Sequence, residues 1–194
     1  MFYPFNRTPF NRSAKYKEVK TTMALVIRSQ WAAYMKCGSG QSAAYALMGE
    51  GFTDLAESKN PQEYSRHYVH EKSERSDVTG YSPSLSYSMD YYSTDPVCAE
   101  IRDITDQEMV GTDAQRQIVL VDLFDGSATA GYTAYERTFA VIPDGKGSGT
   151  DALIYTGTIK SAGDLVKGKF VPSTGTFTPD TTSGGSGGSS GSAG

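Results

Sequence analysis

Two histidines and two cysteines are the side chains of this chain that most often bind metals or act as nucleophiles. His67 and His70 are three residues apart on a segment that is predicted to be extended, so they should point to opposite faces and cannot easily share a metal. Cys37 and Cys98 are too few for a disulfide framework. Cys98 falls within a helix pattern and is expected to be a buried thiol. Both observations favour synthesis in a reducing cytoplasm. We therefore predict no metal and no cofactor.

Sequence motifs for phosphate or acyl chemistry are also missing. No phosphate-binding loop of the type G-x-x-x-x-G-K-[ST] occurs, and the segment GKGSGT at 145–150 follows Pro143-Asp144 as a loop between strands would. No G-x-S-x-G elbow is present. Nothing local supports a Ser-His or Cys-His catalytic pair, and the carboxylates are scattered. The chain is therefore predicted not to be an enzyme.

A different kind of pattern occurs in the segment SLSYSMDYYS, residues 84–93. Read in steps of two, one face carries small polar groups, namely Ser84, Ser86, Ser88 and Asp90. The other face carries Leu85, Tyr87, Met89 and Tyr91. This alternation predicts a half-buried β-strand with one wet face. That face could be an ordinary solvent face or the lining of a channel.

The clearest helix signal is DPVCAEIRDITDQEMVG, residues 95–111. Asp95 is a capping residue, Pro96 suits the first helical position and Gly111 offers a stop. The apolar side chains at helical spacing are Val97, Ile101 and Ile104, with Cys98 and Met109 beside them. We predict that this stripe packs into the core.

The remaining segments predict strands at 45–58, 116–124, 132–142, 152–160 and 165–171, and a last hairpin that turns at 173–175. The strand at 45–58 should bend at Gly49 or Gly51. Residues 60–77 should be extended and polar on both faces. About seven antiparallel strands and one helix indicate a mainly β fold, a sandwich or partial barrel with a flanking helix.

The two ends of the chain differ from this centre. Residues 1–22 hold five basic residues and one acidic residue, a net charge of +4. Since the whole chain has a net charge of −4, the other residues carry −8. Such an arm could bind nucleic acid, dock on the acidic body of a neighbouring copy, or remain a solvated tail. Residues 181–194 are Gly/Ser-rich and should be a flexible coil. We therefore predict a basic N-terminal arm (1–22), a β domain (23–180) and a tail (181–194). No apolar run of about 18 residues predicts a membrane span.

A series of features follows one another between Tyr45 and Pro179. An early strand precedes Asn60-Pro61 and a tyrosine-rich strand; G-Y-x-P then precedes the serine-alternating strand. The D-P helix, V-D-L-F and V-I-P-D come after it. In this order and extent the chain resembles the major tail tube proteins of long-tailed, non-contractile (siphophage-type) bacteriophages of Gram-positive bacteria. The resemblance implies a structural virion protein that forms stacked hexameric rings, the conduit for DNA ejection into the host.

The resemblance also implies partners and a location. The partners are further copies of the chain, the tail tape measure, distal tail and tail terminator proteins, and double-stranded DNA that passes without sequence-specific binding. The location is the phage tail, after assembly in the host cytoplasm. The alternatives are the inner tube of a contractile tail or injection machine, and a virion decoration or carbohydrate-binding β-sandwich module.

Two sets of residues acquire roles from this resemblance. Ser84, Ser86, Ser88 and Asp90 would line the channel, since short neutral or acidic groups do not neutralise DNA phosphates as Lys and Arg do. The polar residues from Glu63 to Glu74 could line it too. The arm would join rings through basic and aromatic residues, namely Phe5, Arg7, Phe10, Arg12, Lys15 and Lys17, with aromatic burial supplying most of the stability.

Overall fold

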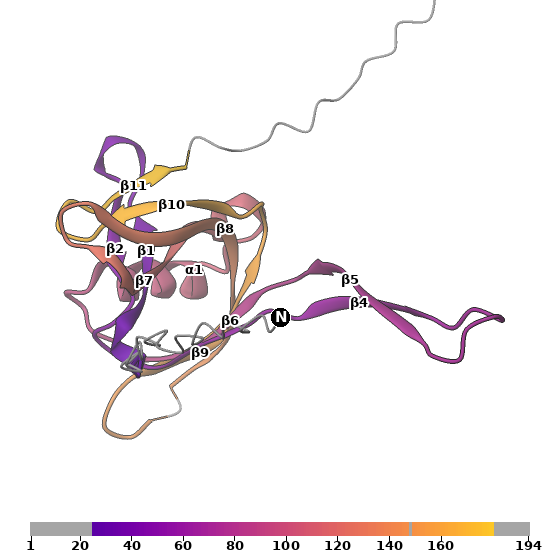
Figure 1. Ribbon diagram of the computed structural model, residues 1–194. Helices are drawn as coiled ribbons and strands as arrows, with labels where there is room; N and C mark the ends of the chain where they lie inside the picture. The colour runs from indigo at the N-terminus through magenta and orange to yellow at the C-terminus, as the bar shows by residue number, and fades with distance from the viewer. Residues whose placement is uncertain (1–24, 148, 181–194) are drawn as a thin grey trace, which may run out of the picture.

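The computed structural model describes residues 25–147 and 149–180, and its main feature is a curved antiparallel sheet (Figure 1). The path of the sheet runs β2-β1-β7-β8-β9-β6-β3, and β10 and β11 extend it from β8. The strands of this sheet are β1 (Trp31–Cys37), β2 (Ala44–Leu47), β3 (Phe52–Ser58), β6 (Ser84–Asp90), β7 (Gln115–Ser127), β8 (Gly131–Lys146), β9 (Ile154–Ser161), β10 (Val166–Val171) and β11 (Thr176–Pro179). The predicted mainly β fold, a partial barrel with one flanking α-helix, is confirmed. The predicted arm (1–22) and tail (181–194) lie outside the described residues.

The curvature follows from how the two ends of this path are joined. β2 and β3 lie at opposite ends, yet only residues 48–51 separate them in the chain. Because a few extended residues span at most about 3.3–3.6 Å each, the sheet must curl to bring its ends together. The prediction of one bent strand at 45–58 is therefore wrong. Gly51 lies in the connection between β2 and β3 and adopts a φ of +85°. A Cβ at this position would lie 2.6 Å from the Asp90 carbonyl oxygen.

The single α-helix of the described residues, α1 (Pro96–Asp106), lies inside this curl (Figure 1). The Asp95 carboxylate accepts hydrogen bonds from the amides of Val97 and Cys98, at 2.8 and 2.9 Å. The apolar stripe of the helix, Val97, Cys98, Ile101 and Ile104, is completely buried against β1, β6, β7, β8 and β9. None of the helices in the described part of the chain has the length and apolar character of a membrane span.

The helix ends earlier than Gly111, the stop that its sequence suggests. Gln107 caps it, and Glu108 adopts a left-handed conformation with φ of 51°. The amide of Met109 donates to the Ile104 carbonyl and the amide of Glu108 to the Thr105 carbonyl. These bonds form a Schellman motif in which a glutamate takes the usual place of glycine. Gly111 instead begins one of the three short 3₁₀ helices found in the described part of the chain, which are η1 (Arg28–Gln30), η2 (Gly40–Ser42) and η3 (Gly111–Ala114).

One strand of the main sheet was not predicted from the sequence. β1 lies between β2 and β7, with Ala33 and Met35 fully buried on the helix side. Its other side faces a second apolar cluster, in which the Phe170 ring of β10 lies 4.6 Å from the Tyr34 ring, centroid to centroid. The hairpin β10–β11 thus covers the outside of the sheet, and it turns after Val171 as predicted.

The segment from residue 60 to residue 81 is a long hairpin and not one extended strand. β4 (Pro61–Arg66) pairs only with β5 (Arg75–Tyr81), as a separate two-stranded sheet that projects from the main sheet (Figure 1). The expectation of one strand over 60–77 is wrong because the turn falls at 67–74. Glu71 organises that turn: its carboxylate pairs with Arg75, and its carbonyl lies 2.7 Å from His67 Nε2.

Candidate functional site

The serine-alternating strand lies in the interior of the main sheet, as β6 between β3 and β9. Ser86 lies opposite Ala56 on one side and Thr158 on the other, and Ser88 lies opposite Asp54 and Thr156. Residues opposite each other in a sheet share a face. Across these three strands the register therefore defines one surface, the serine face, which is polar except for Ala56 and for Ile154 opposite Asp90: Asp54, Ala56, Ser58, Ser84, Ser86, Ser88, Asp90, Ile154, Thr156, Thr158 and Lys160. Ser86 is exposed, and Ser84, Ser88 and Asp90 are half-buried.

The charges on the serine face are few. Ser86 Oγ donates to the Asp54 carboxylate at 3.3 Å, and Lys160 lies across from Ser84. Two carboxylates, Asp54 and Asp90, and one ammonium leave a net charge of −1. The contributions of β9 were not predicted, although its sequence alternates Thr156, Thr158 and Lys160 with apolar or small residues.

The opposite face of β6 is core. Leu85 and Met89 are completely buried, and the Tyr87 ring lies over Gly157, where an added Cβ would be 2.6 Å from Tyr87 Oη. Tyr87 Oη has no hydrogen-bond partner among the described residues. Burial, followed by the nearby Asp144 carboxylate, raises the pKa of Tyr87 to about 12. The helix residues Val97, Ile101 and Ile104 pack on this core side, away from the serine face.

The projecting hairpin offers a second kind of surface. All six residues of β4 are exposed, and large apolar side chains lie open on the strands and the turn: Tyr64, Tyr68, Val69, Val78 and Tyr81. Val69 at the turn is as exposed as in an extended peptide. A two-stranded sheet without a packed face is marginally stable in water. This hairpin therefore carries apolar side chains that no other described residue covers.

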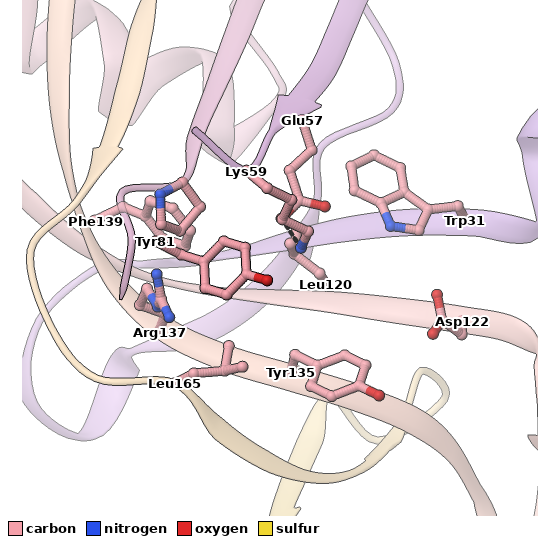
Figure 2. A pocket seen from close by; sticks show the side chains of 11 residues that line it. Trp31, Glu57, Lys59, Tyr81, Leu120, Asp122, Tyr135, Arg137, Phe139 and Leu165 are labelled. Carbon is pink, nitrogen blue, oxygen red and sulfur yellow. Dashed lines mark hydrogen bonds and ion pairs between the residues drawn. The ribbon is translucent and has the colours of Figure 1, made fainter. Parts of the chain in front are cut away.

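A cavity of about 400 Å³ lies near the base of the hairpin, and we call it the Trp31 cavity (Figure 2). Its lining is mainly apolar and comes from five strands and from segments that flank strands: Trp31, Glu57, Lys59, Tyr81, Pro83, Leu120, Asp122, Tyr135, Arg137, Phe139 and Leu165. Arg28 fixes the Trp31 ring. Its guanidinium lies 4.7 Å from the ring centroid and donates to the carbonyls of Trp31 and Leu55.

The charged groups of the Trp31 cavity are unevenly partnered. Lys59 pairs with Glu57, whereas Asp122 and Arg137 have no ion-pair partner in the described part of the chain. Burial, and then the Asp125 and Glu57 carboxylates, raise the pKa of Asp122. Arg137 Nε is buried without a hydrogen-bond partner among the described residues. The described residues contain no group of three metal-ligating side chains.

The arm residues that the sequence analysis selected, Phe5, Arg7, Phe10, Arg12, Lys15 and Lys17, lie outside the described residues.

Neither family models nor curated proteins match this sequence. Among solved structures, the chain is similar to a chain in the tail of an empty gene transfer agent particle, refined with helical C6 symmetry. The TM-score is 0.53 at 17% identity, over 73% of this chain and 97% of that chain. A chain in the native gene transfer agent virion gives a TM-score of 0.47 at 14% identity, over 73% and 97%. The tube-terminating cap of the anti-feeding prophage gives 0.48 at 7% identity, over 80% and 99%.

Proposed function

We propose that this chain is a structural subunit of a phage-type tail tube, which assembles as stacked hexameric rings around a channel for double-stranded DNA. The observation that carries the proposal is the fold, which is shared over nearly the whole length of a chain from a helical tail with sixfold symmetry. The sequence resemblance adds a non-contractile tail from a phage of Gram-positive bacteria. The subunit itself has no enzymatic activity in this proposal.

The serine face supports the role of a channel lining. DNA is gripped by side chains that neutralise phosphates and release counterions, mainly Lys and Arg. The serine face presents short hydroxyl groups with a net charge of −1, and its one cation, Lys160, lies at the end of β6 that begins with Ser84. Such a surface stays hydrated and lets a duplex pass.

The edges of the main sheet support assembly. β2 and β3 end the path, so each has one side without a strand partner among the described residues. Unpaired edges are templates for pairing with another chain, and a closed ring of subunits removes them. The exposed side chains of the projecting hairpin supply a further contact. Burial of Tyr68 and Val69 against a neighbouring subunit would remove their apolar surface from water and stabilise the assembly.

Electron microscopy of the purified full-length protein tests the proposal. At increasing protein concentration, negative-stain images should show rings or tubes with a central hole. Monomers that stay dispersed at high concentration would overturn it. A further test is deletion of residues 1–22, which should shorten or destabilise tubes while the β domain stays folded by circular dichroism. Tubes of normal length and stability would exclude a role of the arm in stacking.

A further inference from the structure

The Trp31 cavity has the features of a binding site for a peptide segment. Its volume of about 400 Å³ falls within the range of roughly 300–1,000 Å³ that is typical of ligand pockets. The apolar walls of the cavity include Trp31, Tyr135 and Leu165. Figure 2 shows the charged side chains of Asp122 and Arg137 at separate positions along the cavity. An occupant would therefore combine an apolar side chain with polar groups of defined sign.

The chemistry of these polar groups narrows the occupant. Asp122 lies near Asp125 and Glu57, and only Lys59 among the neighbouring groups opposes this negative charge. A cation beside Asp122 would relieve the repulsion. Arg137 Nε is a buried donor that lacks an acceptor within the described ranges, and a backbone carbonyl would satisfy it. The occupant therefore needs an apolar side chain for the walls, a cation for Asp122 and a carbonyl for Arg137. A basic peptide that carries aromatic side chains supplies all three.

The N-terminal arm has this composition. Residues 1–22 contain four phenylalanine or tyrosine side chains before residue 11, Phe2, Tyr3, Phe5 and Phe10, and carry a net charge of +4. The described chain begins at Leu25, close in sequence to Trp31. Leu25, Val26 and Ile27 are all exposed and continue the apolar character of the arm toward the cavity. At about 3.3–3.6 Å per extended residue, the chain between Phe10 and Trp31 can reach this cavity or that of a neighbouring copy.

We propose that the Trp31 cavity is the docking site of the N-terminal arm, with an aromatic side chain of the arm against Trp31 and a basic side chain beside Asp122. This inference does not depend on the tail-tube proposal. The proposal assigns the arm one specific docking site. General attraction between a basic arm and an acidic body would not single out any site.

Trp31 is the only tryptophan in the chain, so its fluorescence reports on the cavity alone. The test variant replaces Phe2, Tyr3, Phe5 and Phe10 by serine in the full-length protein. Because loss of the docked ring returns Trp31 to water, its emission should shift to the red and acrylamide quenching should rise roughly twofold. Circular dichroism should show that the fold is retained. Unchanged emission and quenching, in dilute and in concentrated protein, would overturn the proposal.

A matched variant tests the competing occupant, the hairpin turn of a second copy. Tyr68→Ser with Val69→Ser removes the apolar turn and leaves the arm intact, so Trp31 should remain protected. If this variant exposes Trp31 and the arm variant does not, the cavity receives the hairpin and the arm proposal is wrong.

Disulfide capture gives an independent readout. Leu165→Cys in the cavity wall, combined with Phe5→Cys or Phe10→Cys, should form a disulfide under mild oxidation. A bond within one chain or between two chains supports docking and shows whether the arm serves its own subunit or a neighbour. No bond with either arm cysteine would count against docking. If Trp31 is protected by the arm and no tubes form, the arm inference stands and the tail-tube proposal fails.

Discussion

Ser84 on β6 lies directly opposite Lys160 on β9, so the one ammonium of the serine face neighbours the start of the serine strand. Ser84 is also held from the other side, because the Asn60 side-chain amide donates to its Oγ at 3.0 Å. This hydrogen bond ties the Ser84 hydroxyl to the root of the hairpin. The middle of the strand, at Ser86 and Ser88, has no cation opposite it.

This arrangement predicts the effect of adding cations in the middle of the serine face. Ser86→Arg with Ser88→Arg should leave the fold and the assembly in place, because Ser86 is exposed and Ser88 half-buried. Two arginines per subunit, repeated around a ring, should make assembled tubes retain double-stranded DNA at low salt and release it at high salt. Filter binding across a salt series measures this. Arginines at Thr94 and Thr129, which are exposed and lie outside the serine face, are the control. Equal DNA retention by both variants would show that the serine face is not the lining.

The hairpin turn predicts a defect in assembly without a defect in folding. Tyr68→Ser with Val69→Ser removes apolar surface that is exposed in one subunit, so the unfolding midpoint should not change. Since burying one such side chain is worth about 1.5–3 kcal/mol, the concentration needed for assembly should rise roughly tenfold or more. Sedimentation measures it. Val110→Ser, at another exposed apolar position after the helix, should have no effect. Similar losses for both variants would exclude a specific role of the turn.

Local signals explain which parts of this fold the sequence predicts. The prediction of the helix is correct because its cap and its apolar stripe lie within one short segment, from Asp95 to Ile104. Its end was misplaced because Glu108 takes the left-handed position that glycine usually occupies. Gly49 and Gly51 mark the break between β2 and β3 in the sequence. That the two strands lie at opposite ends of the sheet has no local signal, because it depends on closure of the sheet.

The candidate surfaces divide similarly. The alternation of Ser84, Ser86 and Ser88 predicted one wet face, and the register confirms that alternation with Leu85 and Tyr87 buried. Whether that face lines a channel stays a prediction. Lys160 and Asp54 join the face only through pairing with β6, which depends on tertiary structure. The Trp31 cavity could not be predicted either, because five strands, several of them distant in sequence, contribute to it.

Close packing beneath the serine face makes Gly157 sensitive to substitution. A methyl group there would lie 2.6 Å from the Ile142 carbonyl oxygen and from Tyr87 Oη. Gly157→Ala should therefore lower the free energy of unfolding by about 1–3 kcal/mol, as overpacking does. Urea denaturation measures it. At Gly80 an added Cβ meets no atom within 4 Å, so Gly80→Ala is the matched control. Equal effects at the two sites would contradict the packing described for Tyr87.

The cap of α1 predicts a smaller loss. Asp95→Ala removes the acceptor of two amide hydrogen bonds at the start of the helix, which should cost about 1 kcal/mol. The urea midpoint should fall while the circular dichroism spectrum at zero denaturant stays the same. Thr94→Ala changes the exposed neighbouring residue and should leave the midpoint where it is. A midpoint that does not move on Asp95→Ala would mean that solvent replaces the carboxylate without cost.

Tyr87 predicts how stability changes in alkali. Its pKa is raised from 10.0 to about 12, so above pH 10 the unfolded chain releases this proton while the folded chain keeps it. Ionisation therefore favours the unfolded state, and the contribution of Tyr87 to stability is lost as pH rises from 10 toward 12.

Tyr87→Phe keeps the ring and removes a hydroxyl that has no partner among the described residues. The variant should be about as stable as the parent at pH 7 and should lose less stability between pH 9 and pH 11, measured by urea denaturation. Tyr64→Phe on the exposed hairpin controls for the loss of any tyrosine hydroxyl. Parallel loss in the parent and in Tyr87→Phe would show that this hydroxyl reaches solvent or an acceptor in the folded protein.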